Sequence, residues 1–281
     1  MGKLRLMSHN IWNCDNNFPA WQEKGQDCSA QVRMPGMVRV YRETNPDIIG
    51  LQEVSLLQAD LLLRGFLDDG QRYAMLWGKY TPIIYRQDRL ELVESDFLLY
   101  PEKMEGWEGA FNDAKSKACS VALFRDKQDG KLLIFATTHL WWKSSDPTAS
   151  HYQAGSDEAR AYQLNMAMEK LEEYHNKYHC PVVLVGDLNA NYNKPVIQDA
   201  LAKGYAHAHN IATEFADEDW GYHYCFGDGY KPYVPAPFAK AIDHILVKYA
   251  PEGFVRRFER YTPEYYMPLS DHSPVFADVV L

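Results

Sequence analysis

The sequence is poor in the features that stabilise small secreted domains or anchor a chain in a membrane. It has five cysteines in 281 residues, and no two of them are spaced as C-x-x-C. We therefore expect neither a disulfide framework nor a structural zinc site, but thiols in a reducing compartment. No apolar run is long enough to span a bilayer, and the first residues lack the apolar core of a signal peptide. These absences predict a cytoplasmic protein, or a secreted one if a leader has been removed.

Positive charge is also scarce. The chain has 29 lysines and arginines against 38 aspartates and glutamates, which gives a net charge of −9. A protein that holds long nucleic acid through its general surface must neutralise many phosphates. The charge balance therefore disfavours a nucleic-acid partner without excluding one, and the densest basic cluster (Arg256, Arg257 and Arg260) is interpreted as solvated surface.

No repeat, low-complexity segment or flexible linker divides the chain, so residues 1–281 are expected to form a single domain. Short runs rich in Val, Ile, Leu and Phe predict buried strands. These runs are residues 4–8, 48–52, 83–85, 119–124, 132–138, 182–185, 242–247 and 275–279. Apolar periodicity and stop signals predict helices at 34–44, 159–178 and 196–203. Strands interspersed with helices predict an α/β (α+β) fold.

Four long irregular segments, rich in Trp, Tyr, Asp and Gly, separate these elements. They are residues 13–29, 102–117, 141–157 and 216–240. Loops of this length in a compact domain usually carry function.

Polar residues with catalytic potential lie at the ends of the predicted strands. They are Asn10, Glu53, His139, Asp187, Asn189, Asp271 and His272, while Asp243 lies inside a further apolar run. Each alone has an ordinary explanation as a turn or capping residue. Their joint occurrence at strand ends, where layered α/β folds commonly carry the active site, indicates a single catalytic centre.

These residue types suit the attack of water on a phosphate ester. Glu53 and Asn10 offer hard oxygen ligands, which favour Mg²⁺, or Mn²⁺, over zinc. His139 can donate to a phosphoryl oxygen as charge builds there. Asp187 and Asn189, one residue apart in an extended turn, could hold and polarise the attacking water.

One histidine needs a partner. His272 requires a carboxylate to set its tautomer, and Asp243 is the candidate.

Six segments resemble the endonuclease/exonuclease/phosphatase superfamily of metal-dependent phosphohydrolases. They are SHNIW at 8–12, IIGLQEV at 48–54, TTHL at 137–140, VVLVGDLNA at 182–190, AIDHILV at 241–247 and LSDHSPV at 269–275. They occur in the order of the family and span nearly the whole chain. The resemblance implies a four-layer sandwich of two packed mixed β-sheets flanked by helices.

The resemblance also implies residue roles. Glu53 would be the principal metal ligand, helped by Asn10, and Asp271 would reach a metal or its waters. The other expected roles are nucleophile positioning or activation by Asp187 and Asn189, phosphate contact by His139 and His272, and orientation of His272 by Asp243. Whether Asp187 or the His272–Asp243 pair acts as general base is left open.

Two positions depart from the pattern of the family. Many relatives carry Asn where this chain has Thr137, and many bacterial relatives carry Arg where it has Lys117. Neither residue is assigned to the chemistry, so both departures concern the identity of the substrate.

Three further residues are candidates for substrate binding. Asp15 could bind a metal or a substrate hydroxyl, or it could lie in a polar turn. Of Trp141 and Trp142, one is expected in the core and the other in the pocket wall, and Trp141 is our candidate for the wall. Arg160 could pair with phosphate or form a salt bridge within its helix.

We therefore predict a divalent-metal-dependent phosphoester hydrolase. A phosphodiesterase is favoured over a phosphomonoesterase, acting as a monomer on a small or single-ended phosphate ester of a sugar, nucleotide or lipid head group. A DNA or RNA nuclease of the same superfamily is the alternative, and a non-catalytic phosphate-binding module is a remote one.

Overall fold

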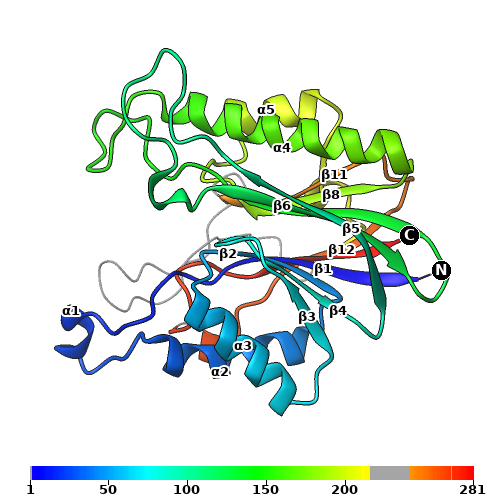
Figure 1. Cartoon of the computed structure of the whole chain (residues 1–281), viewed down its shortest axis with the longest axis horizontal. Coiled ribbons are helices and arrows are strands. Elements are labelled where there is room, and N and C mark those ends of the chain that lie inside the picture. Colours follow the sequence, from blue (N-terminus) through cyan, green and yellow to red (C-terminus); the bar gives the residue numbers. More distant parts are fainter. Residues whose placement is uncertain (1, 216–240, 267) are drawn as a thin grey trace.

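Two β-sheets pack face to face, and helices cover the outer face of each sheet (Figure 1). The computed structural model describes residues 2–215, 241–266 and 268–281. This arrangement is the four-layer sandwich that the resemblance implied.

The first sheet has the order β10-β12-β13-β1-β2-β4-β3 within the described residues. The central strands β1 and β2 run parallel, while β13 pairs with β1 in the antiparallel sense. Its strands are β1 (Lys3–Asn10), β2 (Ile48–Gln52), β3 (Tyr73–Leu76), β4 (Ile83–Arg86), β10 (Glu214–Phe215), β12 (Val255–Arg260) and β13 (Val275–Val280).

The second sheet has the order β5-β6-β7-β8-β11-β9 in the same part of the chain. Here β7 and β8 run parallel, and β11 pairs with β8 in the antiparallel sense. Its strands are β5 (Leu90–Leu99), β6 (Ala118–Asp126), β7 (Leu132–His139), β8 (Val182–Asp187), β9 (Ala206–His207) and β11 (Asp243–Lys248).

The longer helices lie on opposite outer faces of the sandwich. Figure 1 shows α2 and α3 against the first sheet and α4 and α5 against the second. The helices are α1 (Pro19–Gln22), α2 (Ala30–Thr44), α3 (Leu56–Asp68), α4 (Ser156–Tyr178), α5 (Pro195–Ala202) and α6 (Ala208–Ile211), with short 3₁₀ turns η1 (Asp113–Lys115) and η3 (Glu264–Tyr266). No helix among the described residues is both long and apolar enough to cross a membrane.

The two sheets lie very close together at Gly50 of β2. A Cβ on Gly50 of β2 would lie 2.5 Å from Val185 Cγ2 and 2.7 Å from Thr137 Cβ, so only glycine fits between the two sheets here. Thr137, a departure from the family pattern, accepts a hydrogen bond from Gln52 Nε2 at 2.9 Å between the sheets. Its side chain is therefore part of the sheet–sheet contact.

The predicted strands are all present, and the strand at 48–52 has the predicted bounds. The helix at 34–44 begins earlier, at Ala30, and the helix at 159–178 begins at Ser156. The predictions missed α3, β5 and β12, as well as the shorter elements α1, α6, β3, β9 and β10. Of these, α1 lies within the segment 13–29 that was expected to be irregular. In α3, exposed Leu56 and Leu67 blur the apolar stripe. The irregular segment at 216–240 lies outside the described residues.

Candidate active site

Strand pairing brings the predicted residues of both sheets to one edge of the sandwich. Parallel pairing places Asn10 at the end of β1 opposite Gln52, next to Glu53. In the second sheet, His139 pairs with Asp187, and Asp243 lies opposite Asp187 on β11. The carboxyl ends of parallel strands lie at the same edge of a sheet, so chain segments that are far apart in sequence form one centre.

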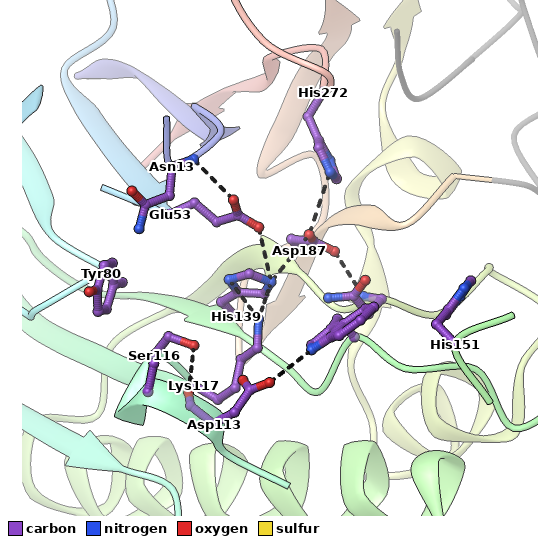
Figure 2. A pocket seen from close by; sticks show the side chains of 13 residues that line it. Asn13, Glu53, Tyr80, Asp113, Ser116, Lys117, His139, His151, Asp187 and His272 are labelled. Carbon is purple, nitrogen blue, oxygen red and sulfur yellow. Dashed lines mark hydrogen bonds and ion pairs between the residues drawn. The ribbon is translucent and has the colours of Figure 1, made fainter. Parts of the chain in front are cut away.

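The site begins with a pair of carboxylates joined by an amide. Asn10 Nδ2 lies 3.0 Å from Asp187 Oδ2 and 3.4 Å from Glu53 Oε1. The backbone N–H of Asn13 donates to Glu53 Oε2 at 3.1 Å, as Figure 2 shows. Glu53 has a φ of 61°, in the left-handed region that a glutamate rarely adopts. Such backbone strain is concentrated at functional sites.

Asp187 lies at the centre of the group. Its Oδ2 is 3.5 Å from His139 Nε2 and 3.7 Å from His272 Nε2. Its Oδ1 accepts the backbone N–H of Asn189 at 2.9 Å, which fixes the carboxylate. Asn189 itself uses Nδ2 to donate to Leu140 O at 3.1 Å, so its side-chain oxygen remains as an acceptor.

His272 is oriented as the sequence predicted. Its Nδ1 lies 2.8 Å from Asp243 Oδ2, and its backbone carbonyl accepts a hydrogen bond from the hydroxyl of Tyr266. Burial opposes protonation, but the carboxylates of Asp243 and Asp187 outweigh it and raise the pKa of His272 well above 6.5. His272 therefore carries a positive charge that faces Asp187.

Lys117 is a candidate that the sequence analysis did not assign to the chemistry. This lysine is buried, and its Nζ lies 2.7 Å from His139 Nε2. Burial lowers the pKa of Lys117 against the opposing effect of Glu53 and Asp187. Burial, Lys117 and His272 together lower the pKa of His139 well below 6.5, so His139 is neutral. The only feature of the sequence that pointed to residue 117 was the lysine at a position where many bacterial relatives carry arginine.

The residues present fit a divalent cation. Asp243 Oδ1 and Asp271 Oδ1 are buried and have no hydrogen-bond partner among the described residues. Burial raises the pKa of Asp243 to about 6 and that of Asp271 to about 7. His272 opposes this rise, and the carboxylates of Glu53 and Asp187 add to it. Ligand atoms of Asp187, Asp243 and His272 lie within 4.8 Å of one another. The carboxylates of Glu53 and Asp187 also converge on Asn10, and with Asp271 Oδ1 they provide hard oxygen donors of the kind that Mg²⁺ or Mn²⁺ takes.

A pocket of about 560 Å³ opens over this group. We call the lining residues whose side chains are described above, at or near strand ends, the floor of the pocket and the other lining residues its rim. The floor consists of Glu53, Lys117, His139, Asp187, Asn189 and His272. The rim consists of Asn13, Tyr80, Asp113, Ala114, Ser116, Trp142 and His151. Tyr80 and His151 lie on opposite sides of the pocket in Figure 2.

The profile of the endonuclease/exonuclease/phosphatase family matches residues 7–272. The chain belongs to this family. Its members hydrolyse phosphate esters and generally depend on divalent metals. No curated protein matches the sequence.

Solved structures share the fold of this family member. A family protein from Bacteroides thetaiotaomicron has a TM-score of 0.73 at 20% identity, covering 100% of this chain and 98% of that one. The mannosyl-6-phosphatase Bt3783 of the same organism has a TM-score of 0.73 at 22% identity, with coverage of 99% and 100%. TDP2 of D. rerio, complexed with a single-strand DNA product, has a TM-score of 0.68 at 17% identity, with both chains covered to 100%.

The three predicted substrate-binding residues are not brought to the pocket of this family member. Asp15 accepts a hydrogen bond from the hydroxyl of Ser55, the residue that caps α3, and is not among the lining residues of the pocket. Trp141 is fully buried and packs on Phe111, so the assignment to the wall is corrected: Trp142 lines the pocket instead.

Arg160 is likewise buried, and both of its Nη atoms bind groups inside the protein. Its Nη1 donates to the carbonyls of Trp141 at 3.0 Å and Lys143 at 2.7 Å, and its Nη2 pairs with Asp157. Arg160 is 3% exposed and is not among the lining residues of the pocket, so it is not placed to bind a phosphate there. Arg160 holds the loop that carries Trp142, which corrects the prediction of a phosphate contact.

Proposed function

We propose that this chain is a Mg²⁺-dependent or Mn²⁺-dependent hydrolase of small or single-ended phosphate esters, acting as one catalytic domain and as a monomer. The observation that carries the proposal is the floor of the pocket, where carboxylates and the cationic or imidazole groups of Lys117, His139 and His272 surround a space open to a ligand. Side chains of this kind can bind a phosphoryl group and activate water at the same place.

Glu53, Asn10 and Asp271 would hold the metal ion. Asn10 Oδ1 accepts the N–H of Trp12 at 3.0 Å, and its second lone pair would be available to the ion. The ion would neutralise phosphoryl oxygens and stabilise the leaving oxygen.

The protein groups divide the proton transfers between them. His272, protonated beside Asp243, donates to a phosphoryl oxygen, since its raised pKa makes it a poor base. Asp187 accepts the proton of the attacking water, and Asn189 orients that water through its side-chain oxygen, which accepts no hydrogen bond from the described part of the chain. Neutral His139, with Lys117 beside it, stabilises the charge that develops on the phosphoryl group.

The charges around the pocket support a substrate with one phosphoryl group. Lys117 is the only lysine or arginine among the lining residues described, and the carboxylates of Glu53, Asp113 and Asp187 face the same space. Neighbouring phosphates of a long nucleic acid would lack cations here. Bt3783, which shares the fold, is a mannosyl-6-phosphatase, and this name supports a small ester.

A panel of esters tests the proposal. Phosphate or alcohol release is measured for sugar, alkyl and nucleotide monoesters, their methyl diesters, sphingomyelin and DNA, with Mg²⁺, with Mn²⁺ and with EDTA. We expect metal-dependent turnover of small esters, and the panel separates monoesters from diesters. Turnover that persists at saturating EDTA contradicts the proposal. Cleavage confined to DNA, with affinity falling steeply as salt rises, favours a nuclease instead.

A further inference from the structure

The rim of the pocket carries an aromatic surface that the chemistry at the floor does not use. The indole of Trp142 is 42% exposed and stacks on the imidazole of His151, with ring centroids 5.6 Å apart and an interplanar angle of 19°. Both rings line the pocket. An apolar ring face left in water gains free energy when a ligand covers it. The rings are therefore suited to bind the organic part of the ester.

A carboxylate with spare acceptor capacity lies beside these rings. Trp142 Nε1 donates to Asp113 Oδ2 at 3.4 Å, and no hydrogen bond reaches Oδ1 from the part of the chain that is described. Figure 2 shows Asp113 below Lys117, at the edge of the pocket. An ionised carboxylate accepts hydrogen bonds only, and it can accept from two hydroxyls at once. Asp113 therefore suits a neutral ligand that is rich in hydroxyl groups.

The segment that carries Asp113 is held rigidly. The buried side chain of Asn112 donates to the carbonyls of Tyr100 at 2.6 Å and Lys117 at 2.8 Å, and accepts the N–H of Lys117 at 2.7 Å. Ala114 and Lys115 have φ values of 51° and 52°, which are strained for residues other than glycine. One short loop thus sets Asp113 on the rim at a fixed place relative to Lys117 on the floor.

The loop that carries Trp142 is anchored by the same helix that contacts the Asp113 segment. Arg160 of α4 binds the carbonyls on both sides of Trp142. Gln163 of α4 accepts the N–H of Trp141 at 2.8 Å and donates to Phe111 O at 2.8 Å. Both loops are therefore fixed before a ligand arrives, which reduces the entropy lost on binding.

We propose that the alcohol part of the ester is a sugar ring, which packs a C–H face against Trp142 and places hydroxyls on Asp113. This inference rests on the proposed function and names its substrate class. One face of a pyranose presents C–H groups that suit the electron-rich face of an indole. The rim residues described include no lysine or arginine, and the carboxylate of Asp113 on the rim would repel a second phosphate on the ligand. Lys143, whose Nζ lies 5.9 Å from the centroid of the Trp142 ring, is not among the lining residues.

The test compares hexose 6-phosphates with methyl phosphate, each as the monoester and as the methyl diester. The methyl group is too small to reach the rim, so the ratio of the two kcat/KM values reports the sugar subsite. We expect the wild-type protein to prefer the hexose ester at least tenfold. Trp142→Ala should lower this ratio about fivefold, and Asp113→Ala about tenfold or more. Trp142→Phe should restore most of the preference.

Trp77→Ala is the matched control, because Trp77 is 41% exposed and is not among the lining residues of the pocket. It should leave the ratio unchanged. A wild-type ratio near one, better turnover of nucleoside 5′-monophosphates than of hexose phosphates, or an equal effect of Trp142→Ala on both esters would overturn the inference.

Failure of the proposed function is distinguishable from failure of the subsite. If no ester is turned over with Mg²⁺ or Mn²⁺, the proposed function fails, and calorimetric binding of hexose 6-phosphate then tests the subsite alone. Binding that weakens in Trp142→Ala but not in Trp77→Ala supports the sugar subsite. Absence of binding, or equal binding to all three proteins, overturns it.

Discussion

The floor and the rim of one pocket are built in different ways. Most floor residues lie at or just beyond the ends of strands, where backbone pairing sets positions such as those of His139 and Asp187. Rim residues such as Trp142 and Asp113 lie on long loops, held by side chains of α4 and by Asn112. The difference indicates that the sheets carry the chemistry while the loops carry the choice of substrate.

Burial follows the same division. His139 and Asp187 are each 2% exposed, whereas Trp142 is 42% exposed. Charges at the floor act in a medium that screens them weakly, so changes there should cost far more activity than changes at the rim.

Among the variants, Glu53→Gln at the floor is expected to lose the most activity. The loss of the carboxylate that would hold the metal should lower kcat roughly 10⁴-fold or more, because the ion supplies several kcal/mol of charge stabilisation. Phosphate release at saturating Mg²⁺ measures this, with Glu91→Gln, an exposed residue paired with Arg125, as control. The urea midpoint should stay near that of the wild type, since Glu53 is partly exposed. A kcat within tenfold of the wild-type value would contradict the role.

A smaller loss is expected for Asp243→Asn. Without the carboxylate, His272 loses its orientation and its raised pKa, and kcat should fall about 10³-fold. Because protonated His272 is the donor, activity falls as pH rises through its pKa, and the variant should show this fall at lower pH. The kcat profile from pH 6 to 10 measures the shift. An unchanged alkaline limb argues against His272 as the donor.

Lys117→Met tests whether the floor trades stability for function. The activity should fall about 10-fold to 100-fold with the loss of a charged donor, while the metal-free protein gains stability because a buried charge is removed. The folded-state pKa of Lys117 is lowered, so its penalty is full at low pH and disappears as pH rises toward the usual lysine value. The gain in urea midpoint over the wild type should therefore be larger at pH 7 than at pH 9.5. A gain that grows with pH would refute this account.

The sequence explains why the floor could be predicted. His139 and Asp187 follow apolar strands and are paired by register, and packing of the two sheets brings Glu53 to within 3.9 Å of His139. The rim could not be predicted in the same way. Trp141 and Trp142 are adjacent in a loop without periodicity, and contacts with Phe111 and Arg160, far away in the chain, decide which one is buried.

The smallest effect on activity is expected for Arg160→Met, which acts through the rim alone. The loop carrying Trp142 loses two anchoring hydrogen bonds, so KM for hexose esters should rise a fewfold with kcat nearly constant. Stability should fall by about 2 kcal/mol because buried carbonyls are left unpaired. Steady-state kinetics and urea unfolding measure both, with exposed Arg64→Met as control. A large loss of kcat would show that rim and floor are not separable.

Strand patterns and strand-end residues were enough to predict an α/β (α+β) fold with polar residues gathered at strand ends, because side chains of a strand have only two directions and neighbouring strands have few registers. The two packed sheets were expected only from the resemblance of six segments to the family. The burial of Trp141, the exposure of Trp142, the place of Asp113 and the contact of Lys117 with His139 came from the folded molecule alone. Each depends on hydrogen bonds or packing between residues distant in the chain, and local sequence preferences do not encode such contacts.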